Sequence, residues 1–129
     1  MRTFKYTKLM LASLLLLISS SVWAKWELVG FDVEENIYYV DLSTKRVVNN
    51  FPRVWSLVSY PKVMLNFMSY RYLLEIDCKE ERARVLSGTW FSEATALGKI
   101  VNSHDSSSPW SYIAPDSMNT KFMNLLCKK

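Results

Sequence analysis

The side chains best suited to catalysis in this 129-residue chain gather in one short polar stretch. His104 and Asp105 stand among serines at positions 103 and 106–108. A histidine, a serine and a carboxylate are the groups of a nucleophilic hydrolase. Neighbouring side chains in an extended segment point to opposite sides, however, so Asp105 is badly placed to orient His104. The chain also lacks the Gly-x-Ser-x-Gly turn that exposes a nucleophile. We therefore predict a solvated loop here, and a protein that is not an enzyme.

The acidic clusters fit no metal or cofactor site. Glu34-Glu35 and Glu80-Glu81 are adjacent pairs expected in exposed turns, whereas carboxylates that share a proton must be held together in a cleft. Residues 32–36 lack the spaced oxygen ligands and the glycine of a calcium loop. No glycine-rich phosphate loop occurs in the sequence. The sequence predicts no cofactor and no metal.

The chain has two cysteines, Cys78 and Cys127. A structural zinc site needs about four Cys or His ligands, more than two cysteines and one histidine supply. A reactive thiol is the other alternative, but neither cysteine has a second at C-x-x-C spacing. In an exported chain the pattern favours a structural disulfide. The chain-entropy estimate for so long a loop is roughly 4 kcal/mol of stabilisation.

The amino terminus predicts export. Positive residues at 2, 5 and 8 precede an apolar run, and Val22-Trp23-Ala24 ends it with suitable residues at −3 and −1 for signal peptidase. The uncharged run from 9 to 24 is shorter than the roughly 20 residues that span a bilayer. We expect a signal peptide over residues 1–24, cleaved between Ala24 and Lys25. Residue 25 is not the lipid-carrying cysteine of a lipoprotein.

The remaining residues, 25–129, are expected to form a single domain with no membrane span. We place it in the periplasm, at the cell surface or outside a Gram-negative bacterium. The formal net charge of +4 falls to +1 without the three positive residues of the signal peptide, and so small a charge predicts no nucleic-acid binding. Core packing explains most of the aromatic residues, with a stacking platform as the alternative. They are Tyr38, Tyr39, Trp55, Tyr60, Tyr70, Tyr72, Trp90 and Trp110.

Alternating apolar and polar residues predict the elements that position these groups. The expected strands are residues 26–31, 36–41, 53–60, 70–78, 82–91 and 97–103. In residues 82–91, the expected shared face is Ala83, Val85, Ser87, Thr89 and Phe91. A hairpin of the fourth and fifth strands would set Glu75 and Asp77 opposite Arg82 and Arg84 as exposed pairs. Residues 41–46 suggest a short helical turn, with Ser43 as its cap.

The C-terminal residues predict a helix. Pro115-Asp116-Ser117 suits a helix start, and Met118, Phe122, Leu125 and Leu126 then fall on one helical face. That face would pack on the sheet and bring Cys127 to Cys78. The predicted fold class is α+β: a mostly antiparallel sheet of about six strands, one C-terminal helix packed on it and one disulfide.

The segment Val63–Met68 is apolar without strand alternation. One interpretation is a buried extension of the fourth strand. The other is an exposed patch for a partner, including a second copy of the chain, because methionine-rich surfaces adapt to partners. Met64, Leu65, Phe67 and Met68 are the candidate partner-binding residues.

Several segments together resemble a known family. They are Trp26-x-Leu28-Val29, Tyr38-Tyr39-Val40-Asp41-x-Ser43, Val54-Trp55-x-Leu57-x-x-Tyr60, Glu75-x-Asp77-Cys78, Ser108-Pro109-Trp110-x-x-Ile113-x-Pro115-x-Ser117 and Cys127. Their order resembles the surface-adhesin protein E-like family of small exported bacterial proteins. The resemblance implies an antiparallel sheet, a C-terminal helix, a Cys78–Cys127 bridge and binding to host proteins such as vitronectin and laminin. The chain departs from the family at Lys25, where a lipid anchor would sit, and at residues 63–69, which carry no charge.

These observations predict an exported, non-enzymatic envelope protein that binds a protein partner and resembles an adhesin. The partner would be a host matrix protein or an envelope protein, with a second copy of the chain, in a homodimer, as another candidate. The alternative is a periplasmic accessory or inhibitor protein that binds a bacterial enzyme or an envelope component.

Overall fold

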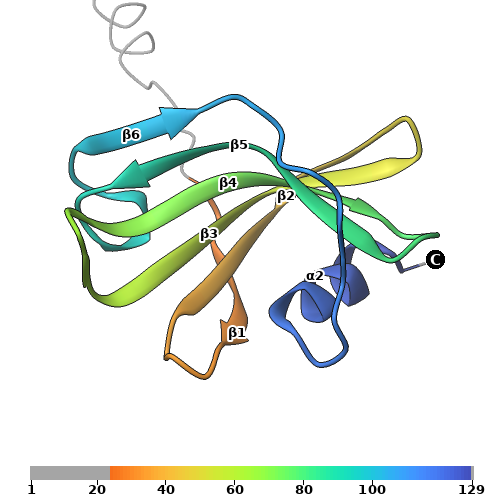
Figure 1. The fold of residues 1–129 in the computed structure, drawn as a ribbon, viewed down its shortest axis with the longest axis horizontal. Helices are drawn as coiled ribbons and strands as arrows, with labels where there is room; N and C mark the ends of the chain where they lie inside the picture. Colours follow the sequence, from red (N-terminus) through yellow and green to blue (C-terminus); the bar gives the residue numbers. More distant parts are fainter. Residues whose placement is uncertain (1–23, 129) are drawn as a thin grey trace, which may run out of the picture.

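The structure, a computed structural model, describes residues 24–128. The predicted signal peptide, residues 1–24, lies outside the described residues except for Ala24, so its cleavage stays a prediction. Within the described part, a 7-stranded antiparallel sheet carries one α-helix on one face (Figure 1). We call this face the helix face and the opposite one the outer face. The strands are β1 (Glu27–Phe31), β2 (Ile37–Val48), β3 (Phe51–Met64), β4 (Phe67–Asp77), β5 (Arg82–Phe91), β6 (Ile100–His104) and β7 (Ser111–Tyr112).

Strands β1 to β6 neighbour each other in chain order, while β7 pairs with the first residues of β5. Short hairpins produce this order, because a tight turn leaves the next strand no other place to pair. At the β2–β3 turn, Asn49 and Asn50 have φ of 52° and 69°. Positive φ at both central residues defines the hairpin turn that matches strand twist. The predicted fold class is confirmed.

Strand β2 is longer than the sequence predicted. Residues 41–46 belong to it, so the expected helical turn is wrong. The register of β2 against β3 shifts between Asp41 and Arg46, which marks a bulge. There the Trp55 backbone N–H donates to Thr44 Oγ1 over 3.0 Å, and Ser43 donates its hydroxyl hydrogen to Asp41. The polar side chains that suggested a helix cap instead form hydrogen bonds at the point where the β2–β3 pairing is irregular.

Helix α2 (Met118–Leu126) starts where predicted, at the N-cap Ser117, whose Oγ accepts the Thr120 N–H. Its residues Phe122 and Leu126 are buried in the core that also contains Val40, Val54, Val58, Tyr72, Leu74, Ile76 and Ala83. Cys78, just past β4, is bonded to Cys127 at the C-cap, with 5.8 Å between their Cα atoms. The predicted disulfide is confirmed, and it fixes the end of α2 to the sheet.

A second bulge changes the faces of β5. Leu73 pairs with Ser87 but Leu74 pairs with Val85, which leaves Leu86 as the extra residue. Side chains beyond Leu86 therefore switch sides. Trp90 lies on the helix face beside Tyr70, and Phe91 lies on the outer face under the Arg71 guanidinium, 5.1 Å from the ring centroid. The predicted common face of residues 83 to 91 is wrong because strict alternation takes no account of a bulge.

Candidate functional site

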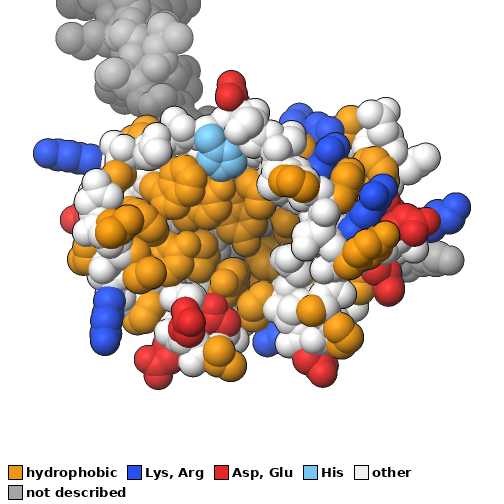
Figure 2. Space-filling model, viewed as in Figure 1, with side chains coloured by type: hydrophobic (Ala, Val, Ile, Leu, Met, Phe, Trp, Pro, Cys, Tyr) orange, Lys and Arg blue, Asp and Glu red, His pale blue; other side chains and the backbone are white. Residues whose placement is uncertain are grey.

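Helix α2 covers only part of the helix face, and aromatic rings occupy much of the rest (Figure 2). The aromatic cluster consists of Tyr60, Phe67, Tyr70, Tyr72, Trp90 and His104. Tyr70 is its centre, stacked on Trp90 at 4.4 Å and on Tyr72 at 5.2 Å between ring centroids. Phe67 also contacts Trp90, with 6.3 Å between the two ring centroids. The rings are therefore one continuous surface rather than scattered core residues.

His104 belongs to this cluster. Its Nε2 is 2.6 Å from the Tyr70 hydroxyl, and its Nδ1 is 3.2 Å from the carbonyl oxygen of Ser106. Gly88, opposite His104 on β5, makes this contact possible, because a Cβ there would overlap the Tyr70 phenol. Among the described residues, Asp105 makes no hydrogen bond to His104. The predicted solvated loop is thus only partly observed: His104 is half-buried and structural, while Asp105 is exposed.

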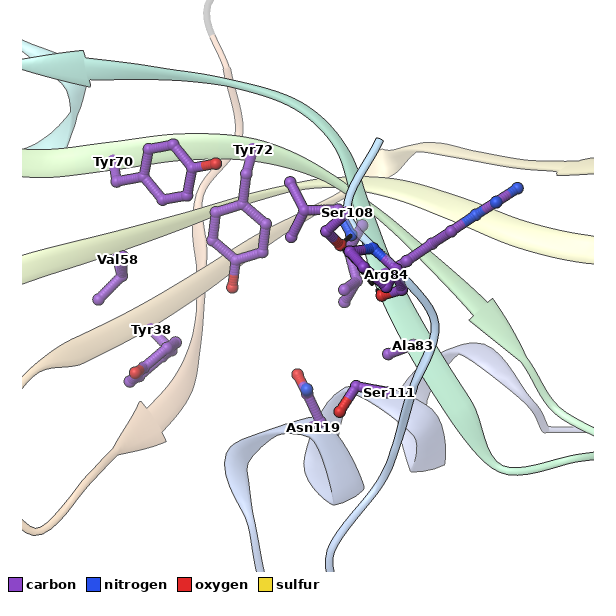
Figure 3. A pocket seen from close by; sticks show the side chains of 12 residues that line it. Tyr38, Val58, Tyr70, Tyr72, Ala83, Arg84, Ser108, Ser111 and Asn119 are labelled. Carbon is purple, nitrogen blue, oxygen red and sulfur yellow. Dashed lines mark hydrogen bonds between the residues drawn. The ribbon is translucent and has the colours of Figure 1, made fainter. Parts of the chain in front are cut away.

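A cleft of about 330 Å³ lies between this cluster and the N-terminal end of α2 (Figure 3). We call it the Tyr72 cleft. Its lining comes from β2 to β5, from α2 and from the segment 105–112, which we call the strap. The lining residues used below are Tyr38, Tyr70, Tyr72, Arg84, Ser111 and Asn119. In Figure 3 the hydroxyl of Tyr72 points into the open space between Tyr38 and Asn119.

The phenols around the cleft stay neutral far above physiological pH. Burial raises the pKa of Tyr70 to about 12. Burial, together with a hydrogen bond to Asp32 over 3.1 Å, also raises the pKa of Tyr38 to about 12. The pKa of Tyr72 is raised as well, mainly by burial. These groups act as neutral hydrogen-bond donors and acceptors, not as bases.

The strap is held on β5 by backbone and aromatic contacts. The Ser108 N–H donates to the Val85 carbonyl over 2.8 Å, and the Val85 N–H donates to Ser108 Oγ over 3.0 Å. The guanidinium carbons of Arg82 and Arg84 lie 4.7 and 4.3 Å from the Trp110 ring centroid. Such cation–π contacts and the β7 pairing fix Ser111 at the cleft wall.

The predicted pairs between β4 and β5 form, but the carboxylate of each pair is buried. Glu75 is fully buried, with Arg53 Nε at 2.5 Å and Arg84 Nη2 at 2.7 Å. Asp77 pairs with Arg82 at 2.9 Å. The expectation of exposed pairs is wrong because two arginines and the strap close over the outer face at this point. Arg84 therefore brings no uncompensated charge to the cleft.

The segment Val63–Met68 forms the tip of the β3–β4 hairpin. Leu65 is 95% exposed, and Val63 and Met64 are exposed as well, whereas Phe67 and Met68 are partly buried. The pairing of β3 with β2 ends at Ser59, so the hairpin tip extends beyond its neighbour in the sheet. For residues 63–65 the structure shows an exposed apolar patch, not a buried extension of the strand.

Residues 24–128 contain no group of three or more His, Cys, Asp or Glu side chains placed to hold a metal ion. Nor does this part of the chain include a helix with the length and apolar character needed to cross a bilayer. The aromatic cluster, the Tyr72 cleft and the hairpin tip are the candidate functional surfaces of this part of the chain.

The comparisons with known proteins agree with this architecture. Structures of Haemophilus influenzae protein E superpose on the chain. One does so with a TM-score of 0.62 at 16% identity, covering 84% of this chain and 88% of that one. Crystal form II of the same protein gives a TM-score of 0.61 at 15% identity, with 84% and 91% coverage. A sequence search of curated proteins gave no match. The family model for surface-adhesin protein E matches residues 26–128, and the chain belongs to that family.

Proposed function

We propose that this protein is exported and acts without catalysis, by binding a protein partner in the manner of an adhesin. The observation that carries the proposal is the exposed apolar hairpin tip. Val63, Met64 and Leu65 face solvent, although transferring apolar surface out of water is favourable by roughly 25 cal/mol per Å². Exposed apolar patches of this kind mark interaction sites.

The surroundings of the tip support the same proposal. Phe67 contacts Tyr60 and Trp90, so the exposed tip adjoins the aromatic cluster. A hollow of about 440 Å³, lined in part by Leu65, Phe67 and Trp90, lies between the two. Partner surfaces commonly combine adaptable side chains with buried aromatic anchors. A partner side chain inserted in this hollow would contact both.

The proposed location is the periplasm or the cell surface, reached through the signal peptide of residues 1–24. The domain of residues 25–129 would carry no lipid anchor, since Lys25 follows the proposed cleavage site. The proposed partner is a host matrix protein. An envelope protein or a second copy of the chain is the alternative that the experiment distinguishes.

The test compares three forms of residues 25–129: the natural sequence, M64D/L65D and V33D. Val33 is fully exposed in the β1–β2 turn, so V33D adds a charge at an exposed apolar residue elsewhere. Binding is measured on immobilised extracellular-matrix extract and on solubilised envelope extract, and self-association by sedimentation. We expect M64D/L65D to reduce binding to the matrix extract at least tenfold, with an unchanged circular dichroism spectrum, and V33D to bind normally.

Equal binding by M64D/L65D and the natural sequence would contradict the proposed contact surface. Loss of binding to the envelope extract alone would favour the periplasmic accessory role. A dimer that M64D/L65D dissociates would identify the tip as a self-association surface.

A further inference from the structure

The Tyr72 cleft contains a polar group without a protein partner among the described residues, the hydroxyl of the nearly buried residue Tyr72. Tyr72 is 7% exposed, and none of the hydrogen bonds among residues 24–128 involves its hydroxyl. The hydroxyl is not sealed in the core, because it points into the cleft, as Figure 3 shows. A nearly buried phenol usually bonds a neighbour. The Tyr72 hydroxyl is therefore free to form a hydrogen bond with a ligand in the cleft.

Two more polar side chains face the same space. Asn119, from the first turn of α2, and Ser111, from the strap, both line the cleft near the Tyr72 hydroxyl (Figure 3). Neither side chain has a hydrogen bond among the described residues. An amide both donates and accepts, and so does a hydroxyl. The three groups together match a ligand that carries several hydroxyl groups.

The opposite part of the cleft is aromatic. Figure 3 shows the ring of Tyr70 nearly face-on at one edge of the space, with Tyr38 at another. The face of an aromatic ring is negative and attracts partly positive C–H groups. Trp90 and Tyr72 both stack on Tyr70, at 4.4 and 5.2 Å between ring centroids, so only the part of the Tyr70 ring that lines the cleft is open to a ligand. A ligand with one apolar face of C–H groups would fit against it.

The charges around the cleft further limit which ligands it can bind. The one charged residue in the lining is Arg84, and buried Glu75 binds its guanidinium on the outer face at 2.7 Å. Tyr38, Tyr70 and Tyr72 stay protonated at neutral pH, since burial raises the pKa of each. An acidic ligand therefore finds no free cation, and a basic ligand finds no free carboxylate in the lining. The site selects a neutral molecule.

We propose that the Tyr72 cleft binds a neutral pyranose sugar, with the sugar's C–H face on Tyr70 and its hydroxyls bonded to Tyr72, Asn119 and Ser111. A volume of about 330 Å³ is at the small end of the range for ligand pockets and suits a mono- or disaccharide. A purely apolar side chain would fit less well, because it would leave the Tyr72 hydroxyl without a partner and desolvated. This inference does not depend on the hairpin tip or its partner.

The experiment titrates ¹⁵N-labelled residues 25–129 with maltose, cellobiose, lactose and N,N′-diacetylchitobiose. Galacturonic acid is the charged comparison and benzyl alcohol the apolar one. We expect at least one neutral disaccharide to shift the backbone signals of Tyr70 and Tyr72 and the side-chain amide signal of Asn119. Galacturonic acid and benzyl alcohol should leave them in place.

The variant Tyr72→Phe isolates the hydroxyl. It keeps the ring and breaks no hydrogen bond within the described residues, so its melting temperature should equal that of the natural sequence. Its affinity for the bound disaccharide should fall on the order of fivefold, the effect of one net hydrogen bond. Tyr39→Phe is the matched control. It removes a hydroxyl from the residue that follows Tyr38 on β2 and lies outside the cleft lining, so this variant should bind the disaccharide normally.

Three results would overturn the proposal: no neutral disaccharide shifts these signals, Tyr72→Phe binds as tightly as the natural sequence, or benzyl alcohol or galacturonic acid binds better than every sugar. The M64D/L65D variant keeps the cleft. Loss of partner binding in that variant with sugar binding intact would therefore separate this inference from the proposed function.

Discussion

Asp77 stands at the end of β4, where its neighbours keep the carboxylate charged. Burial by itself would raise the pKa of Asp77, but the Glu80 backbone N–H and the Arg82 guanidinium outweigh it and lower the pKa below its usual 3.8. The unfolded chain therefore takes up this proton at a higher pH than the folded one. The stabilisation that the group provides is complete above the usual pKa and is lost as the pH falls through the lowered one.

We predict that Asp77→Asn destabilises the protein at neutral pH and flattens the acid dependence of its stability. Between about pH 5 and pH 2, the free energy of unfolding of the natural sequence should fall more steeply than that of the variant. Urea unfolding over a pH series measures both slopes. Asp105→Asn, an exposed aspartate without such contacts, serves as the control and should keep the natural slope. Identical slopes for Asp77→Asn and the natural sequence would refute the role of Asp77.

Helix α2 depends on its attachment to the sheet. It has nine residues, fewer than an isolated helix needs to be stable in water. Two attachments hold it: the burial of Phe122 and Leu126 in the core, and the bond from Cys127 to Cys78. Because Asn119 lines the Tyr72 cleft, the position of α2 also sets the shape of that cleft.

We predict that C78S/C127S lowers the free energy of unfolding by about 2–5 kcal/mol, the usual cost of removing a disulfide from a small exported domain. Backbone amides of α2 should exchange with deuterium faster than those of the central strands β3 and β4. The reduced natural protein is the matched control and should behave like the variant. Equal stability of the oxidised protein and the variant would show that packing alone fixes the helix.

The molecule as a whole has two unlike faces. On the outer face, charged residues are paired, as Glu75 is with Arg53 and Arg84. On the helix face, α2 covers the core beside an aromatic surface with the cleft at its margin (Figure 2). The helix face thus presents an apolar, aromatic surface, which agrees with membership of the surface-adhesin protein E family.

We predict that the mature protein begins at Lys25. Signal peptidase should cut after Ala24, because Val22 and Ala24 present suitable residues after the apolar run. Intact mass spectrometry of the protein purified from the cell envelope measures the start. Ala24→Asp, which blocks the −1 position, should leave the longer form. A natural protein whose mass still includes residues 1–24 would contradict the prediction.

The sequence alone determined the helix and the places of strands β1 to β6, but neither β7 nor the second half of β2. Side-chain alternation identified the strands, the helical period of residues 118–126 identified α2, and short turns made consecutive strands neighbours. Two cysteines, in a chain predicted to be exported, were enough to predict the Cys78–Cys127 bond. These features follow from local periodicity and chain connectivity, both of which can be read from the order of residues.

Only the tertiary structure decided the faces and the sites. The bulge at Leu86 moved Trp90 beside Tyr70. Glu75 is buried between Arg53 and Arg84, because burial depends on residues far away in the chain. The hairpin tip is exposed because the pairing of β3 with β2 stops at Ser59. The pattern of residues 63–68 does not contain this information. The Tyr72 cleft brings together Tyr38, Tyr72, Ser111 and Asn119 from separate elements. Its unpartnered hydroxyl exists only once those elements have packed.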